Sequence, residues 1–218
     1  MTLLARANAL RLPLRDGSVH CVVTSPPHWT PWAVGYDGLG SEPSPLDYAL
    51  ALLPAMREVA RVLRDDGTIW LHLGADKYHA DGSLAGYPWT VARVLHATLG
   101  LLVRSHIAVA RGVRRSEARP PSACDTLFLL AKSREHYWHR CPASDVWTVD
   151  EEPVRYGLFS ALPGSVVSPC VVAGCPSGGL VLDPFAGTGV VPRVAERLGR
   201  RGVGFDLSSS AFGVGLGR

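Results

Sequence analysis

Hydrophobic residues along the chain form short continuous runs and longer periodic stretches, and the two kinds alternate from one end to the other. The short runs are rich in Val, Ile and Leu and end at Gly, Pro or charged residues, so each predicts a buried strand. The six predicted strands span residues 18–25, 68–74, 101–110, 126–133, 179–184 and 201–208. Apolar strands that alternate with helices predict an α/β fold with a doubly wound, mostly parallel sheet.

The periodic stretches predict three helices, over residues 45–67, 88–100 and 188–200. In the first, apolar residues recur every three or four positions, and the Asp-Asp-Gly at 65–67 is expected to end the helix. Pro54 lies inside this stretch, which leaves open a kinked helix or two separate helices. Pro192 falls in the first turn of the third helix, where proline is tolerated.

Composition indicates a globular protein and says little about its activity. The chain has 218 residues, of which 47% are hydrophobic and 19% charged, and these values suit one folded domain. No apolar run reaches the roughly 18 residues of a membrane span, and the first residues lack the apolar core of a signal peptide, so we expect a cytoplasmic protein. The five cysteines form no C-x-x-C pair, so we expect reduced thiols and no bound metal.

Positive charge is concentrated between residues 104 and 140. This segment has eight Arg or Lys residues and three acidic residues, whereas the net charge of the whole chain is only +3. Its arginine cluster is suited to contacts with nucleic-acid phosphates and consists of Arg111, Arg114, Arg115 and Arg119. The charge pattern alone leaves open a solvated basic loop that binds nothing.

The stretch "LVLDPFAGTGVV" (180–191) places a turn of small residues between a predicted strand and a predicted helix. Gly187 and Gly189 have no side chain, so a ligand can lie close to the backbone of this turn. Asp206 follows Gly189 by 17 residues, near the spacing at which an acid binds ribose hydroxyls. These features predict a site for an adenosine-containing cofactor. Pro192 replaces the third glycine of the dinucleotide motif and no Gly-Lys-Ser/Thr is present, which disfavours NAD and ATP.

The stretch "VTSPPHW" (23–29) ends another predicted strand on Ser-Pro-Pro. Two prolines cannot donate backbone hydrogen bonds, so the strand has to stop there. The simplest interpretation is a rigid turn in which His28 and Trp29 cap the hydrophobic core.

Together, "VTSPPHW" and "VLDPFAGTG" resemble the two signature motifs of S-adenosylmethionine-dependent DNA amino-methyltransferases. Their order, with the catalytic motif before the cofactor motif, is that of the circularly permuted group called class β, and the resemblance covers almost the whole chain. It implies a Rossmann-like methyltransferase fold in a single domain over 1–218. Within it we expect a catalytic half near 1–135, an irregular recognition stretch near 111–160 and a cofactor-binding half near 155–218.

The resemblance also implies roles for the site residues. Residues from the cofactor motif and from neighbouring segments are expected to bind S-adenosylmethionine: Asn8, Thr24, Phe159, Ser160, Asp183, Pro184, Phe185, Gly187, Thr188, Gly189 and Asp206. The target base is expected to leave double-stranded DNA and to enter the catalytic motif, which consists of Ser25, Pro26, Pro27, His28 and Trp29. There the Ser25 hydroxyl and the Pro26 carbonyl would accept the amino hydrogens, and the ring of His28, or of Trp29 in its place, would stack on the base.

Serine at the first position of the catalytic motif favours N4 of cytosine as the target, with N6 of adenine as the alternative. The chain differs from the family pattern at three positions, where His28 replaces Tyr, Phe or Trp, Asn8 replaces Asp and Arg155 replaces His. A catalytically impaired DNA-binding relative is therefore a further hypothesis. A methyltransferase that acts on RNA or on another amino-bearing substrate is another, because acceptor motifs of this type serve those substrates too. No segment is large enough for a bulky recognition domain, so specificity is expected from loops, from a homodimer or from a restriction or specificity partner.

The remaining histidines show no spacing typical of a metal site. We expect structural or surface roles for His72, His79, His96, His106, His136 and His139. Four tryptophans are expected to pack in the hydrophobic core and not to stack on a nucleic-acid base: Trp70, Trp89, Trp138 and Trp147.

Overall fold

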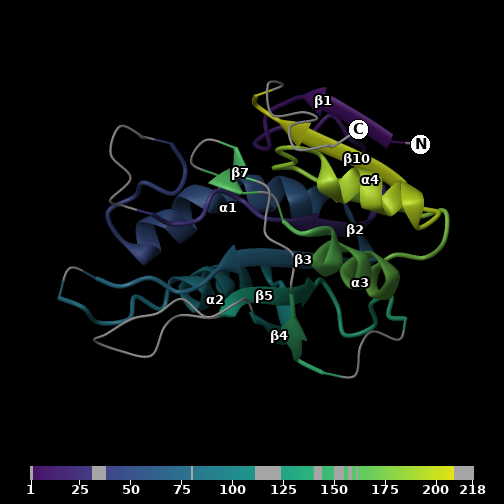
Figure 1. Ribbon diagram of the computed structural model, residues 1–218. Helices are drawn as coiled ribbons and strands as arrows, with labels where there is room; N and C mark the ends of the chain where they lie inside the picture. The colour runs from purple at the N-terminus through teal and green to yellow at the C-terminus, as the bar shows by residue number, and fades with distance from the viewer. Residues whose placement is uncertain are drawn as a thin grey trace.

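The computed structural model describes residues 2–30, 38–79, 81–110, 124–139, 144–149, 155–156, 159–160 and 162–208. These residues form three layers, with a twisted sheet in the middle and helices on both of its faces (Figure 1). Strands from both sequence halves form this one sheet, in which the two strands of the cofactor-binding half lie side by side between strands of the catalytic half, so both halves share its core.

The eight-stranded sheet has the order β1-β10-β9-β2-β3-β5-β4-β6. Its strands are β1 (Thr2–Arg6), β2 (Val19–Thr24), β3 (Leu63–Gly74), β4 (Leu102–Ala110), β5 (Cys124–Ala131), β6 (Val146–Thr148), β9 (Leu180–Asp183) and β10 (Arg201–Asp206). Strand β5 runs antiparallel to β3 and β4, while all other neighbours in the sheet are parallel. The predicted doubly wound, mostly parallel sheet is therefore confirmed. A separate ladder pairs β7 (Arg155–Tyr156) with β8 (Phe159–Ser160).

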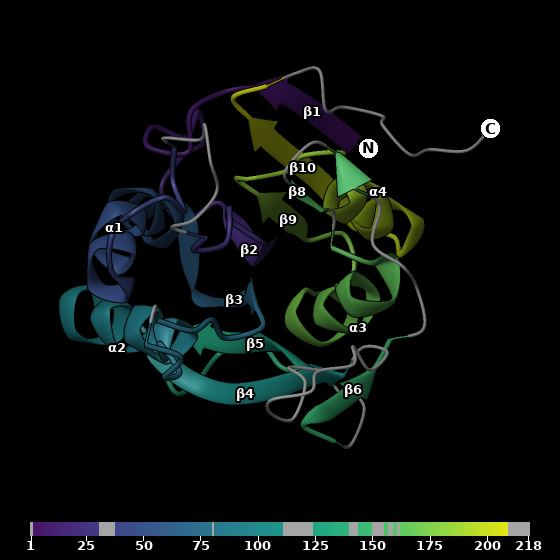
Figure 2. The same ribbon diagram turned by 60° about the vertical axis from the view of Figure 1, so that its left-hand side comes forward.

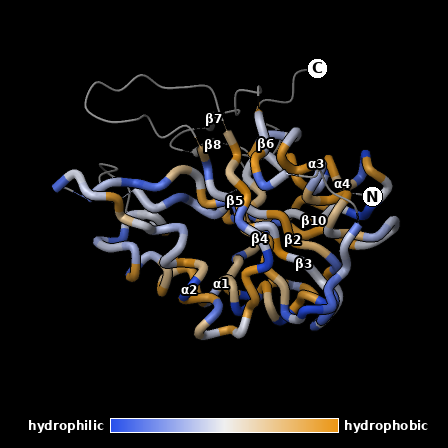
Figure 3. Tube along the Cα trace, turned by 90° about the horizontal axis from the view of Figure 1, so that it is seen from below, coloured by the Kyte–Doolittle hydropathy of each residue, from blue (hydrophilic) through white to orange (hydrophobic). Residues whose placement is uncertain are grey.

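Two pairs of helices cover the sheet (Figure 2). Helices α1 (Pro45–Val62) and α2 (Tyr87–Leu99) pack together on one face, and α3 (Gly164–Gly174) and α4 (Val190–Arg197) pack together on the other. Successive strand residues point to opposite faces, so Val22 of β2 enters the core under α1 and α2, whereas Cys21 and Val23 enter the core under α3 and α4. Figure 3 shows the resulting hydrophobic stretches along the central strands.

Helix α1 begins where the sequence predicts, but it ends earlier. Ser44 caps the helix, because its side chain accepts a hydrogen bond from a backbone amide of the first turn. The helix continues through Pro54 and ends at Val62, five residues before the predicted end. Leu63 already pairs with Val19 as the first residue of β3, and the charged residues that were expected to end the helix lie in this strand, in an irregular stretch before the next pair at Thr68.

The hydrophobic pattern does not predict helix α3. Its sequence, GSVVSPCVVAG, is apolar on nearly every side and contains Pro169, so no amphipathic period marks it as a helix.

None of the described helices is both long enough and apolar enough to cross a membrane. Helix α4 is closer to its prediction, with Pro192 as the third of its eight residues.

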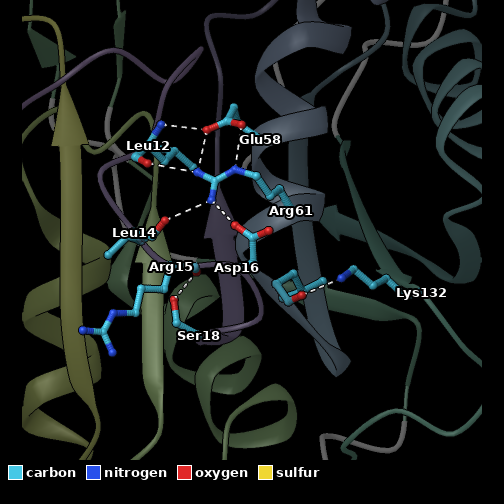
Figure 4. A network of polar contacts seen from close by, with 9 residues as sticks. Leu12, Leu14, Arg15, Asp16, Ser18, Glu58, Arg61 and Lys132 are labelled. Atoms are coloured by element: carbon cyan, nitrogen blue, oxygen red, sulfur yellow. Dashed lines mark hydrogen bonds and ion pairs between the residues drawn. The ribbon is translucent and has the colours of Figure 1, made fainter.

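A polar network fastens the segment between β1 and β2 to helix α1 (Figure 4). Arg61 donates hydrogen bonds to the carbonyls of Leu12 and Leu14, each at 3.0 Å, and forms ion pairs with Glu58 and Asp16. Glu58 also accepts the Leu12 amide at 2.9 Å. These contacts fix the course of a loop that starts at the carboxyl end of β1.

The parallel strands β2, β3, β9 and β10 are neighbours, so their carboxyl ends lie at one edge of the sheet. Ligands of open α/β sheets bind at this edge. Both sequence motifs begin here, because the Ser-Pro-Pro turn follows β2 and the glycine turn follows β9.

Candidate active site

Asp183 links the two sequence motifs. It ends β9, is buried, and accepts hydrogen bonds at Oδ1 from the Thr24 hydroxyl (2.7 Å) and from the Phe185 amide (3.0 Å). Thr24 is the last residue of β2, directly before the Ser-Pro-Pro turn. Burial raises the pKa of Asp183 to about 7, and the hydrogen bond from Thr24 acts in the opposite direction. The glycine turn and the catalytic turn are thus held side by side.

The glycine turn leaves its backbone open to close approach. Gly187 and Gly189 have positive φ angles of 48° and 81°, which residues with a side chain rarely adopt. Asp206, at the end of β10, accepts the Gly187 amide at Oδ2 and the Ser208 amide at Oδ1, both at 2.9 Å. Each carboxylate oxygen has a further lone pair, so Asp206 can also accept hydrogen bonds from ribose hydroxyls.

The side chain of Thr188 provides independent evidence that a polar ligand binds at this turn. Its hydroxyl is buried and has no hydrogen-bond partner among the described residues. Buried hydroxyls usually have such a partner, so an unsatisfied one next to Gly187 and Gly189 fits a cofactor with polar groups. The residues at this turn therefore suit S-adenosylmethionine.

Ser25 is the centre of a group of polar side chains from neighbouring strands. Its Oγ lies 3.1 Å from His28 Nε2 and 3.0 Å from His72 Nδ1. The other ring nitrogen of His72 lies 3.1 Å from Asp125 Oδ2. His72 is on β3 and Asp125 is on β5, so the order of the sheet places both behind the turn that follows β2.

His72 and Asp125 are the site residues that sequence reasoning missed. His72 is predicted as a structural or surface residue, but it is 2% exposed and contacts the catalytic motif. The signal in the sequence is the position of His72, a polar residue near the end of the otherwise apolar strand "TIWLHLG". The partner of that residue follows only from the pairing of β3 with the distant strand β5.

The His28 ring packs against the end of β3. A Cβ added at Gly74 would lie 2.6 Å from His28 Nδ1, so a glycine at this position leaves room for the ring. The ring centroids of His28 and His72 are 5.3 Å apart, and the rings are tilted by 52°. The Tyr48 hydroxyl donates to the Pro27 carbonyl at 2.8 Å and so fixes the preceding proline turn.

Trp29 belongs to the hydrophobic core. Its side chain is 2% exposed, its Nε1 donates to the Glu42 carbonyl at 2.8 Å, and its ring packs against Tyr87. A ring in this position cannot stack on a base without leaving the core. The structure therefore corrects the catalytic role expected for Trp29, and for this residue the interpretation as a cap of the core holds.

The structure places only some of the other predicted site residues. Pro184 and Phe185 lie in the glycine turn beside Asp183. Asn8 is exposed just after β1, where its side chain accepts the Leu10 amide at 2.9 Å. Two groups lie outside the described residues, namely the side chains of Phe159 and Ser160 and the arginines Arg111, Arg114, Arg115 and Arg119.

The fold and the site define an enzyme that holds an adenosine-containing cofactor beside a turn of hydrogen-bond acceptors. The chain matches the DNA methylase family over residues 19–213. The Type II methyltransferase M.SmaI of Serratia marcescens is 32% identical over 234 residues, which cover 86% of this chain and 80% of the relative. The Type II methyltransferase M.Cfr9I of Citrobacter freundii is 30% identical, over 95% of this chain and 83% of the relative.

Solved structures share the fold. The PvuII DNA methyltransferase, described as cytosine-N4-specific, has a TM-score of 0.82 at 16% identity and covers 96% of this chain and 83% of its own. The putative DNA modification methylase TTHA0409 from Thermus thermophilus, solved with S-adenosyl-L-methionine, has a TM-score of 0.75 at 22% identity. The match covers 97% of this chain and 90% of that protein. The chain therefore belongs to the DNA methylase family and is an S-adenosylmethionine-dependent DNA methyltransferase. The family, the fold and the cofactor predicted from the two motifs are confirmed.

Proposed function

We propose that the protein methylates the N4 amino group of cytosine in double-stranded DNA. The observation that carries the proposal is the position of Ser25, which the bond between Thr24 and Asp183 holds beside the cofactor turn. Serine at this position of the motif favours cytosine, and a protein of the same fold is described as cytosine-N4-specific. The Type II relatives support a restriction partner, and a DNA substrate suits the expected cytoplasmic location.

S-adenosylmethionine would be held at the ends of β9 and β10. Asp206 would accept hydrogen bonds from the ribose hydroxyls, and Thr188 would gain a partner for its hydroxyl. Gly187 and Gly189 would leave room for the adenosine. When bound, the cofactor supplies an electrophilic methyl group on a sulfonium, so the protein has to present a nitrogen lone pair to it.

The base would be held by the turn after β2. An exocyclic amino nitrogen is a weak nucleophile, because its lone pair is delocalised into the ring. Ser25 Oγ and the Pro26 carbonyl would accept its two hydrogens and so favour a localised lone pair. The described residues donate no hydrogen bond to the Pro26 carbonyl, whereas the Pro27 carbonyl is already bonded to Tyr48. His28 would stack on the flipped base.

The basic segment 104–140 would contact DNA phosphates. It includes the connection from β4 to β5, and β5 begins at Cys124, next to the site residue Asp125. This connection contains the predicted phosphate ligands, Arg111, Arg114, Arg115 and Arg119.

Transfer of labelled methyl groups tests the proposed function directly. The protein is incubated with tritiated S-adenosylmethionine and mixed-sequence duplex DNA, and the nucleosides are separated by chromatography. We expect label in N4-methylcytosine, and no turnover by the Ser25→Ala variant, which lacks the acceptor hydroxyl.

Three outcomes would contradict parts of the proposal. Label only in N6-methyladenine would overturn the choice of base. Preferential labelling of RNA over competing duplex DNA would overturn the choice of nucleic acid. Salt-dependent DNA binding without turnover above that of Ser25→Ala would identify a catalytically impaired DNA-binding protein.

A further inference from the structure

Ser25, His72 and Asp125 form a continuous chain of hydrogen-bonding groups that leads from the base side of the site into the protein. His72, in the middle, is buried, and Asp125 is mostly buried, with a side chain 12% exposed. The described residues contain no group of three His, Cys, Asp or Glu side chains that could hold a metal ion. In serine hydrolases the same three groups in series move the hydroxyl proton to the imidazole, while the carboxylate orients the imidazole and stabilises the imidazolium.

The chemistry of the three groups sets the direction of their hydrogen bonds. An ionised carboxylate only accepts, so His72 Nε2 carries a hydrogen and donates it to Asp125. The other nitrogen of a neutral imidazole is then an acceptor, so the Ser25 hydroxyl donates to His72 Nδ1. Because the single hydroxyl hydrogen is used, His28 Nε2 donates to Ser25 Oγ. One lone pair of Oγ remains, and it can accept a hydrogen of the substrate amino group.

We propose that His72 and Asp125 form a proton relay behind Ser25, which removes a proton from the substrate amino nitrogen during methyl transfer. The inference rests on the proposed methylation of an exocyclic amino group and adds two positioning residues to that reaction. A methylated amino nitrogen becomes positively charged unless it loses a proton, so a nearby acceptor lowers the barrier to transfer.

The reaction balances as one coupled step. The nitrogen lone pair forms a bond to the methyl carbon, while the carbon–sulfur bond breaks and leaves its electron pair on sulfur. One proton moves from the nitrogen to Ser25 Oγ, and the Ser25 hydroxyl proton moves to His72 Nδ1. The imidazolium that results is stabilised by Asp125, and its proton returns through Ser25 to water after the product has left.

Single-turnover methylation of duplex DNA, with enzyme in excess, tests the relay. In His72→Asn the amide can still bond to Ser25 near the position of Nδ1, but it cannot take up a proton or reach Asp125. We expect the rate constant to fall about 100-fold, while the dissociation constants for S-adenosylmethionine and DNA stay within about twofold. His96→Asn is the matched control, because His96 lies in the last turn of α2, before the start of β4 and away from the site, and it should keep the wild-type rate.

Asp125 provides a second arm of this experiment. Asp125→Asn keeps the size of the side chain but removes the charge that stabilises the imidazolium, so we expect a slower rate as well. Because Asp125 acts only through His72, the double variant should be no slower than His72→Asn alone. A rate for His72→Asn within about threefold of wild type, or additive losses in the double variant, would overturn the relay.

Nitrogen-15 NMR of the histidine rings in the free protein gives a readout that does not depend on activity. We expect His72 to carry its hydrogen on Nε2 in the wild type, and Asp125→Ala to shift it toward a mixture of tautomers. A hydrogen on Nδ1 of neutral His72 would overturn the proposed direction of transfer. If the wild type methylates DNA and the His72 and Asp125 variants do so at the wild-type rate, the relay is overturned and the proposed function stands. If the wild type methylates no nucleic acid, both the proposed function and the relay are overturned.

Discussion

His28 shows how one residue can serve two purposes in this site. Its Nε2 is bonded to Ser25, and its ring packs at the end of β3 against Gly74. The Tyr or Phe that the family motif can have at this position could stack on a base but has no ring N–H to donate to the serine. The imidazole combines a stacking surface with a donor that helps to orient the Ser25 hydroxyl toward His72.

The stacking role of His28 predicts a difference between two variants. His28→Ala removes the ring, and the loss of base stacking, about 1–3 kcal/mol, should lower the single-turnover rate by about 5- to 150-fold. His28→Tyr restores the ring of the family motif and should keep or exceed the wild-type rate. Calorimetry should show unchanged affinity for S-adenosylmethionine in both, because the cofactor lies on the other side of the transferred methyl group. Equal rates for the Tyr and Ala variants would show that His28 does not stack on the base.

At the scale of elements, the Arg61 network explains how a long loop is held without secondary structure. Two backbone carbonyls of the segment between β1 and β2 have the Arg61 guanidinium as their donor. The exposed ion pair between Arg64 and Asp66, three residues further along, involves no backbone group of another segment. Substituting each arginine in turn therefore distinguishes the stability that comes from holding a loop from the stability that comes from an exposed ion pair.

This contrast predicts different stabilities for two matched variants. Arg61→Met keeps the aliphatic stem but leaves the Leu12 and Leu14 carbonyls without their donor, and should lower the free energy of unfolding by about 1–2 kcal/mol. For a chain of this size, that corresponds to a thermal midpoint about 2–8 °C lower. Arg64→Met should leave the midpoint unchanged, because exposed ion pairs contribute little. Equal midpoints for the two variants in scanning fluorimetry would contradict the fastening role of Arg61.

The elements differ in how well the sequence predicts them. Strand β2 ends at Thr24, one residue before its predicted end, because the two prolines act locally and leave no alternative. The end of α1 could not be predicted in this way, since the pairing of Leu63 with Val19 depends on strands far apart in the sequence. Helix α3 has no polar face to mark its period, and only its packing against the sheet and against the neighbouring helix α4 explains why it is apolar.

At the scale of the whole molecule, the site combines what short motifs predict with what only the sheet can provide. The glycine turn and the Ser-Pro-Pro turn are local patterns, and their adjacency follows from the parallel neighbours β2 and β9. His72 and Asp125 belong to no local pattern. They meet Ser25 only because β2, β3 and β5 are consecutive in the sheet, and this order is set by packing on both faces.

Asp183, which links the two motifs, also affects how the stability of the whole protein depends on pH. Burial raises its pKa from 3.8 to about 7, so at pH 5 the folded protein holds a proton on this group that the unfolded chain has lost. The folded state binds more protons between about pH 4 and pH 7, and its stability therefore falls as the pH rises through this range. Above pH 7 the buried carboxylate is charged, and the whole penalty for burying it is present.

The variant Asp183→Asn should remove this dependence. Both hydrogen bonds to Asp183 are accepted by Oδ1, which asparagine retains, so the variant keeps the link between the two motifs without the buried charge. At pH 4, where the penalty has only begun to develop, the thermal midpoints of the wild type and the variant should be similar. At pH 8 the variant should be more stable by about 4 kcal/mol, or about 8–16 °C in scanning calorimetry, since each pKa unit corresponds to about 1.4 kcal/mol. A difference in midpoint that is the same at both pH values, or larger at pH 4, would show that Asp183 does not titrate in this range in the folded protein.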